Sequence, residues 1–406
     1  MQSEVFAHVN PSPDAGTGQG SLAGKRVGVQ SLFSVRGWPC TGGSKALDGF
    51  QPLEDATVVR LLKEAGAVFM GNTHVSELGL GIAEDTSAQA VAEGQVDVAL
   101  MLDTLGEART AAARAGLYGF KPGWGRISRF GLMGLAPSME CIALLAAAPE
   151  DLSRVYAAIA HVDERDPSMV EAQSPSIPEG GAPPRKVRRA GFNPELVARL
   201  TPGEQKAFSR AMLQLEQAGL TPVEVSLPDW DLFAPTHQVI TAVEASSSCG
   251  KYDGVRFGHR ASGAKNWNEM YLQTRKEAFG LLLKTFLFQG AYFQFENYQA
   301  FEDACRVRGR LIRMSEQLFA DLEVLALPTL QDGRDATAVR DIASLYQAFT
   351  LTLTANVTGQ PAVTIPGCLR TNGHQDIGLQ LMGPQGSETA LLALAQQISV
   401  QTEEVA

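Results

Sequence analysis

Two carboxylates in this 406-residue chain stand where side chains could do chemistry. Asp103 and Glu107 lie four residues apart, directly after the apolar run at residues 96–102. A carboxylate can act as a general base when a cleft perturbs its pKa, so this pair is a candidate acid–base site. The histidines fall in unrelated segments without the spacing of metal ligands, at His74, His237, His259 and His374. We therefore expect no metal and no cofactor.

The composition is that of an ordinary globular chain and argues against several classes of function. Lys and Arg number 34 against 44 Asp and Glu, and this net charge of −10 offers no concentrated basic surface for nucleic acid or an anionic membrane. The five cysteines are scattered and odd in number, which argues against a disulfide framework and a structural zinc site. The N-terminal residues lack a signal-peptide pattern, and no apolar run reaches the roughly 18–20 residues of a membrane span. We expect a cytoplasmic protein.

The elements that must position these side chains alternate between short apolar strands and amphipathic helices, which predicts an α/β fold. We expect strands at residues 26–30, 67–70, 96–102, 221–226 and 323–327. We expect helices at residues 56–65, 87–93, 202–218 and 388–400, with a mostly helical stretch at 266–318. Asp55 is predicted to cap the first helix and Gly66 to end it, and Asn372-Gly373 predicts a hairpin turn.

Two segments have the composition of loops. Residues 1–21 are rich in Gly, Pro and Ser, which predicts a flexible lead-in, and residues 161–184 are typical of a surface linker. We expect residues 22–406 to form a single domain.

Several runs of residues resemble the motifs of a known family. The strongest is Gly-Phe-Lys-Pro-Gly-Trp-Gly-Arg-Ile-Ser-Arg-Phe-Gly-Leu at 119–132, and Gly-Gln-Pro-Ala-Val at 359–363 and Ile-Gly-Leu-Gln-Leu-Met-Gly at 377–383 support it. On these runs the chain resembles the amidase signature family, and within it the A subunits of glutamyl-tRNA(Gln) amidotransferases. The resemblance implies one large mixed β-sheet with helices on both faces, and a Ser–cis-Ser–Lys triad that cleaves amides.

The resemblance also shows that all three triad positions have changed. Gln30 stands where the family has the basic lysine, Ala83 where it has the relay serine, and Glu107 where it has the nucleophile. Ala83 and Glu107 keep the family spacing of 24 residues. Losing one triad member of a serine hydrolase costs about 10⁴–10⁶ in rate, so ordinary amidase activity is not expected.

The surroundings of the triad have changed in the same direction. The former oxyanion loop is Asp103, Thr104, Leu105 and Gly106, in which Leu105 replaces a glycine. The positions that hold the glutamine donor in the amidotransferase subunits match His237, Phe286 and Phe349, which cannot pair with the charged ends of glutamine. Glu107 needs a partner if it is buried. Our hypothesis is that it pairs with Arg109 or Arg114 and plugs the oxyanion hole.

Two functions remain open at this point. The first is a catalytically inactive amidase-fold protein that acts by binding or scaffolding, with a protein partner or a second copy of itself, in the way that the amidotransferase protein works with its own partner subunits. The second is a hydrolase of altered chemistry that uses Asp103 or Glu107. Neither involves nucleic acid or membrane directly, and a small-molecule ligand stays unspecified.

Overall fold

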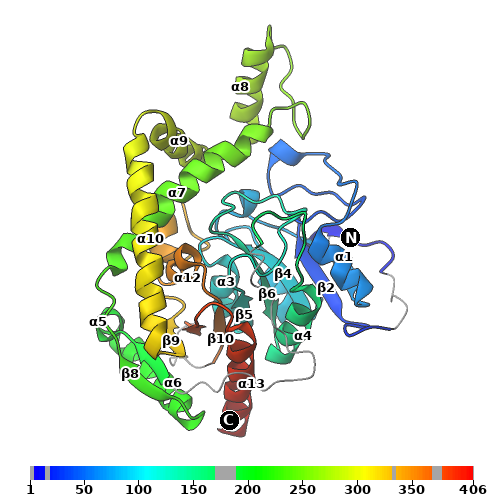
Figure 1. The fold of residues 1–406 in the computed structure, drawn as a ribbon. Helices are drawn as coiled ribbons and strands as arrows, with labels where there is room; N and C mark the ends of the chain where they lie inside the picture. The colour runs from blue at the N-terminus through cyan, green and yellow to red at the C-terminus, as the bar shows by residue number, and fades with distance from the viewer. Residues whose placement is uncertain (1–3, 14–18, 170–188, 332–334, 368–376, 406) are drawn as a thin grey trace.

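The structure is a computed structural model that describes residues 4–13, 19–169, 189–331, 335–367 and 377–405. In this part of the chain one mixed sheet of 11 strands runs through the molecule (Figure 1). In spatial order the strands are β1 (Phe6–Val9), β3 (Val68–Thr73), β2 (Arg26–Gln30), β4 (Val98–Asp103), β6 (Cys141–Ala146), β5 (Tyr118–Lys121), β10 (Ala362–Ile365), β11 (Leu379–Met382), β9 (Val324–Pro328), β7 (Arg189–Phe192) and β8 (Thr221–Glu224).

The sheet is buried on both faces where the candidate site lies. All six residues of β4 and all six of β6 are buried. β2 pairs in parallel with β3 and β4, whereas β4 and β6 run antiparallel. A strand buried on both faces needs a helical layer on each side, and the helices supply both. The predicted fold class, a mixed α/β sheet covered on both faces, is confirmed.

The helices fall into groups around the sheet. α2 (Ser87–Ala92) and α3 (Glu107–Ala115) contact each other and β4, while α4 (Pro149–Ile159) packs with α1 (Thr57–Glu64) and α13 (Glu388–Val405). The other described helices are α5 (Pro194–Ala198), α6 (Pro202–Gln217), α7 (Phe233–Ser248), α8 (Trp267–Ala278), α9 (Leu281–Phe295), α10 (Tyr298–Asp321), α11 (Ile342–Phe349) and α12 (Leu353–Thr358).

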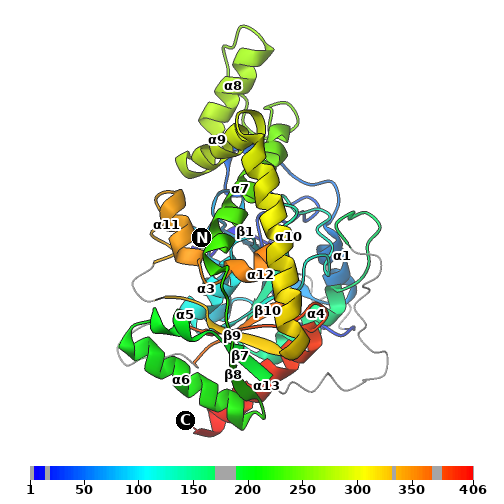
Figure 2. The ribbon, with the colours of Figure 1, turned by 60° about the vertical axis from the view of Figure 1, so that its left-hand side comes forward.

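One end of the molecule is purely helical. α7, α9 and α10 pack side by side there, and α8 projects beyond them (Figure 2). Among the described residues, none of the helices combines the length and the apolar composition needed to cross a membrane.

The predicted elements are present, with shifts at their ends and two local differences. Asp55 does not cap α1; its carboxylate accepts from the Arg36 backbone N–H and from Lys63, so the helix begins after Ala56 without a side-chain cap. Within the expected lead-in, Phe6–Val9 forms the edge strand β1 by pairing with β3. The hairpin turn predicted at Asn372-Gly373 and most of the linker predicted at 161–184 lie outside the described residues.

Candidate functional site

The position of the missing basic lysine lies at the end of β2. Gln30 is buried, and its Oε1 accepts a hydrogen bond of 2.7 Å from the Leu102 backbone N–H of the neighbouring strand β4. Its Nε2 donates to the Asp85 carboxylate at 2.6 Å. An amide has no basic nitrogen near neutral pH, so Gln30 ties two segments together and cannot accept a proton.

The relay position is not part of this cluster. Ala83 is exposed, and Asp85, two residues later, takes the place beside Gln30. The peptide bonds of the described residues are all trans. Asp85 also accepts from the Ser87 N–H at 2.8 Å, and the Ser87 hydroxyl lies 2.8 Å from that of Thr73. Sequence reasoning missed Asp85, because alignment with a serine-glycine motif gives no reason to examine a residue that replaces a glycine.

Asp85 is a titratable group in a changed environment. Burial raises its pKa to about 6, although the hydrogen bonds from Gln30 and Ser87 favour the charged form. The carboxylate therefore changes charge just below neutral pH. Its hydrogen-bond partners are an amide, a hydroxyl and a backbone N–H, which position it without supplying a nucleophile.

Glu107, at the nucleophile position, closes the former oxyanion loop. It is the first residue of α3, and its Oε2 accepts from the backbone N–H groups of Thr104 at 2.7 Å, Leu105 at 2.7 Å and Gly106 at 3.1 Å. Its Oε1 accepts from the Gly81 N–H at 3.4 Å. A helix N-terminus with convergent N–H groups is an anion site. In this chain a side chain of the protein itself occupies that site.

The environment of Glu107 shifts its ionisation. Burial and the nearby Asp103 charge raise the pKa of Glu107 to about 8, while the N–H groups of Leu105 and Thr104 favour the carboxylate. The hydroxyl of Tyr346 is buried close enough for Glu107 to raise its pKa in turn. Glu107 therefore titrates near neutral pH inside the protein.

The arginines expected beside Glu107 bind other carboxylates. Arg109 and Asp103 are fully buried and form a two-pronged ion pair, with Nη2 to Oδ1 at 2.9 Å and Nε to Oδ2 at 3.2 Å. Arg114 pairs with Asp335 at 2.9 Å. This corrects the expected arginine partner of Glu107, because backbone N–H groups take that role. Asp103 lies within the same network, and Asn356 donates a further bond of 2.9 Å to it.

This network also fixes the charge of Asp103. Burial alone would raise its pKa, but the charges of Arg109 and Lys121 and the hydrogen bonds from Arg109 and Asn356 lower it overall. A carboxylate with a lowered pKa that is bonded to a guanidinium is a poor proton acceptor.

Lys121 is a second buried cation that sequence reasoning missed, because it lies inside the strongest family motif. Its Nζ donates to the Pro122 carbonyl at 2.9 Å and lies 3.7 Å from the Cys141 thiol. Burial lowers its pKa. Its hydrogen bonds remain on β5 and β6, so it does not replace the missing base at Gln30.

The loop that carries Glu107 is closed from a third side by Thr352. The Thr352 hydroxyl donates to the Leu105 carbonyl, and the Thr352 carbonyl accepts from Arg109 at 2.9 Å. Gly106 has φ +118°, and a Cβ there would lie 2.1 Å from the Thr352 hydroxyl oxygen. Glycine is therefore required at 106 both for its backbone conformation and for this close approach.

The three positions that match the donor pocket are all fully buried, at His237, Phe286 and Phe349. His237 lies against the former oxyanion loop, with Nε2 2.9 Å from the Thr104 carbonyl and Nδ1 2.8 Å from the Tyr346 hydroxyl. Since a carbonyl only accepts, Nε2 carries the proton and Nδ1 accepts from Tyr346. Burial lowers the pKa of His237 to about 4. This histidine is a neutral structural link between α7 and the loop.

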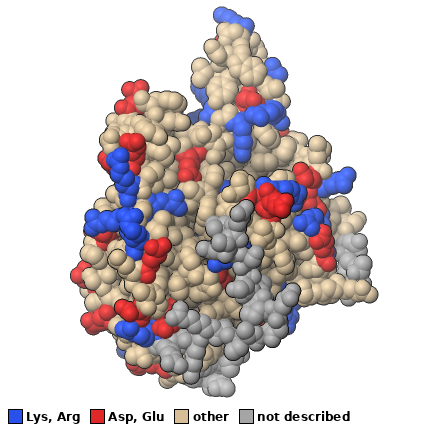
Figure 3. Space-filling view, in the orientation of Figure 1, with Lys and Arg blue, Asp and Glu red and all other residues tan. Residues whose placement is uncertain are grey.

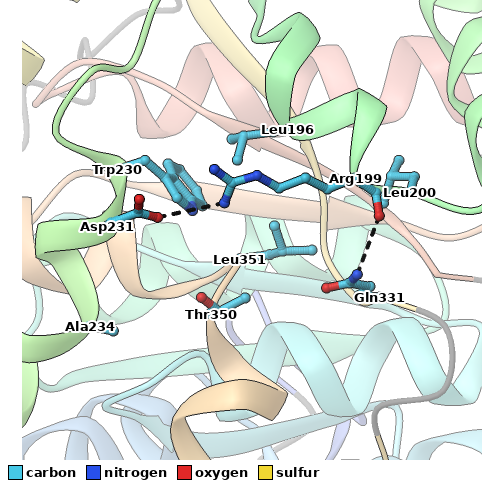
Figure 4. A pocket seen from close by; sticks show the side chains of 9 residues that line it. All are labelled: Leu196, Arg199, Leu200, Trp230, Asp231, Ala234, Gln331, Thr350 and Leu351. Carbon is cyan, nitrogen blue, oxygen red and sulfur yellow. Dashed lines mark hydrogen bonds and ion pairs between the residues drawn. The ribbon is translucent and has the colours of Figure 1, made fainter.

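A separate hollow of about 360 Å³ lies beside the segment that leads to Thr352 (Figure 4). Arg199 and Asp231 meet across it at 3.6 Å, and the Gln331 amide donates to the Arg199 carbonyl at 3.5 Å. Both charged side chains are largely exposed, and the remaining lining residues are Leu196, Leu200, Trp230, Ala234, Thr350 and Leu351. None of the triad positions lines this hollow. In the described part of the chain no cluster of three His, Cys, Asp or Glu side chains could hold a metal ion.

Comparison with known proteins identifies the family. The family model described as "Amidase" matches residues 11–88 and 86–392, which is most of the chain. The chain belongs to the amidase family. This amidase-family protein is 32% identical to the A subunit of the glutamyl-tRNA(Gln) amidotransferase of Symbiobacterium thermophilum, over 93% of this chain and 82% of the relative. It is 33% identical to the protein of the same name from Natronomonas pharaonis, over 93% and 95% of the two chains.

Solved structures agree with the fold of this amidase-family protein. The glutamyl-tRNA(Gln) amidotransferase protein of the same name from Thermotoga maritima matches with a TM-score of 0.75 at 24% identity, covering 97% of this chain and 87% of that one. The structure titled "Crystal structure of PAM12A" gives a TM-score of 0.77 at 21% identity, over 98% and 89% of the two chains. A third match is titled as a vestigial protein complex that reveals the origins of an s-triazine catabolic enzyme, with a TM-score of 0.74 at 25% identity over 95% and 85%.

Proposed function

We propose that this chain is a cytoplasmic amidase-family protein that does not hydrolyse amides and acts by binding a protein partner. The observation that carries the proposal is the position of Glu107. Its carboxylate takes the three backbone N–H groups that would have to receive an oxyanion during amide cleavage. A substrate would have to displace a covalently attached anion from a helix N-terminus before any chemistry could begin.

The other two triad positions support the same proposal. Gln30 offers no base, and both polar atoms of its amide are bonded within the protein. Ala83 has no hydroxyl and is exposed, so it relays no proton. Amide cleavage by this family's chemistry needs a nucleophile, a relay and a base together.

The binding role is supported by what the relatives are. The matched relatives are named as one of the subunits of an amidotransferase, and one matched structure is titled as a vestigial protein complex. These descriptions make a protein partner the most economical role for a chain of this fold without the family's catalytic groups. The four cysteines in the described residues are all free, which is typical of a reducing compartment and supports the cytoplasmic assignment.

The alternative, a hydrolase of altered chemistry, has less support. Asp103 is held by Arg109 and Asn356, and Glu107 by backbone N–H groups, so both carboxylates already have partners. The raised pKa of Glu107 is the one property that favours a role as a base.

Ammonia release by the purified chain tests the proposal. The substrates are glutamine, asparagine, simple aliphatic and aromatic amides and ureido compounds, and a family member with an intact triad serves as the positive control. Glu107→Ala is the paired variant. We expect no release above that of the variant. Turnover by the wild type that Glu107→Ala abolishes would overturn the proposal and make Glu107 a catalytic residue.

A further inference from the structure

α9 is apolar on two opposite faces although it lies at the surface. Its inner face packs on α7 with Leu283, Phe286, Leu287 and Gly290 buried. A Cβ at Gly290 would lie 1.9 Å from the Ala242 carbonyl oxygen, which shows how closely the two helices approach. Of the 15 residues of α9, only Lys284 carries a charge.

The outer face of α9 exposes large apolar side chains in one row. Leu281 is 78% exposed, Phe288 74%, Tyr292 52% and Phe295 75%, and Tyr298 at the start of α10 continues the row at 53%. We call these five side chains the α9 stripe. The surface over α9 in Figure 3 is mostly tan, with charged side chains at its rim. A helix that is apolar all round is normally buried.

The α9 stripe is large enough for a stable interface. With about 200 Å² for each large side chain, the exposed fractions amount to roughly 650 Å² in one copy. Two copies would bury about 1,300 Å² in total, above the roughly 1,000 Å² expected of a specific interface. α9 has 15 residues, too few for the ~20 that span a bilayer, and it lacks the basic polar face of helices that lie on a membrane.

The spacing of the α9 stripe is self-complementary. Leu281 and Phe295 lie seven residues to either side of Phe288, which is two helical turns in each direction. An antiparallel pair of α9 helices around a twofold axis at Phe288 would therefore place Leu281 on Phe295 of the other copy and the two Phe288 rings together. Lys284 and Tyr292 lie four residues to either side of Phe288, so each ammonium faces an aromatic ring and not another ammonium.

We propose that two copies of this chain form a twofold dimer through antiparallel α9 helices, with Phe288 at the axis. Leu281, Tyr292 and Phe295 are the further anchors. This inference does not depend on the proposed loss of amidase activity, because α9 contributes none of the triad positions.

The first test is sedimentation velocity over a wide range of concentrations. The wild type is expected to sediment at twice the chain mass, and Phe288→Asp to weaken the dimer by roughly 30-fold or more. The matched control is Leu53→Asp, since Leu53 is 91% exposed and lies outside the α9 stripe. A wild type that stays monomeric overturns the proposal. So does a dimer that survives Phe288→Asp.

The second test fixes the geometry by crosslinking in a Cys305→Ser background, because Cys305 is the exposed thiol among the described cysteines. Under oxidation Phe288→Cys should crosslink to itself, as expected of a residue on the axis. Leu281→Cys should crosslink only when mixed with Phe295→Cys. Crosslinking of Leu281→Cys to itself at equal yield would contradict the antiparallel pairing. A monomer that binds phosphatidylcholine–phosphatidylglycerol vesicles through Phe288 would assign the α9 stripe to lipid and overturn the dimer.

Discussion

The former catalytic centre and the outer face of α9 depart from ordinary burial in opposite directions. The centre buries charged groups, and each of Asp103, Glu107 and Arg109 has partners within the protein. The α9 stripe exposes aromatic side chains that no part of the described chain covers. Buried charges are costly unless they are paired, and exposed apolar patches mark places where another molecule binds. The difference indicates that the family's active site has become part of the folded core, while the capacity for interaction lies on the surface.

The largest effect that would sharpen this comparison is at the buried ion pair. Arg109→Met leaves Asp103 charged and buried without its partner, and we expect the free energy of unfolding to fall by about 3–5 kcal/mol. Urea denaturation measures the change. Arg60→Met, which breaks the exposed pair of Arg60 with Glu64, is the control and should cost no more than about 0.5 kcal/mol. Equal costs at the two pairs would show that the centre is not a stabilising core.

The next largest effect is at the close approach of Gly106 and Thr352. Gly106→Ala meets both the unfavourable φ and the Thr352 side chain, so we expect a loss of about 3 kcal/mol or more in unfolding free energy. Gly116→Ala is the matched control, since Gly116 also has positive φ but its Cβ would meet nothing within 4 Å. The control should lose only the ~1–2 kcal/mol of left-handed backbone strain. Similar losses would mean that Thr352 does not close the loop.

A smaller effect concerns the pH dependence of stability. The folded-state pKa of Glu107 is raised to about 8, so the folded chain holds a proton there that the unfolded chain releases at lower pH. Stability should therefore fall as pH rises towards and through 8. Between pH 6.5 and 9, above the titration of Asp85, the loss should be about 2 kcal/mol.

Glu107→Gln should remove most of this slope, because glutamine stays neutral across the window. The exposed Glu64→Gln is the control and should leave the slope unchanged. Denaturation midpoints at several pH values measure it. A slope that persists in Glu107→Gln would place the titrating group elsewhere.

The fold was largely predictable because its signals are local. Apolar runs identified β2 and β4, and the alternation of strand and helix, with the motif at residues 119–132, indicated the mixed sheet. The strand β1 was not predicted because Phe6–Val9 is too short to show a pattern. Its order comes from pairing with β3, which is a contact distant in sequence.

The candidate site was predictable in its losses but not in its contacts. The residue types at Gln30 and Glu107 were enough to predict missing chemistry, and Glu107 was expected to plug the oxyanion loop. Its partners were mistaken because backbone N–H groups have no signature in a sequence, whereas Arg109 and Arg114 do. The pairing of Asp85 with Gln30 joins residues 55 positions apart, and only the packing of the loop before α2 on the end of β2 brings them together.

The most direct test of the account is anion binding by Glu107→Ala. Removing the side chain frees three N–H groups at the N-terminus of α3, which should then bind a small carboxylate. At equal ionic strength, acetate or propionate should raise the Tm of Glu107→Ala saturably, by about 1–3 °C relative to chloride, and leave the wild type unchanged. An equal response of the wild type and the variant would contradict the claim that Glu107 fills the oxyanion hole.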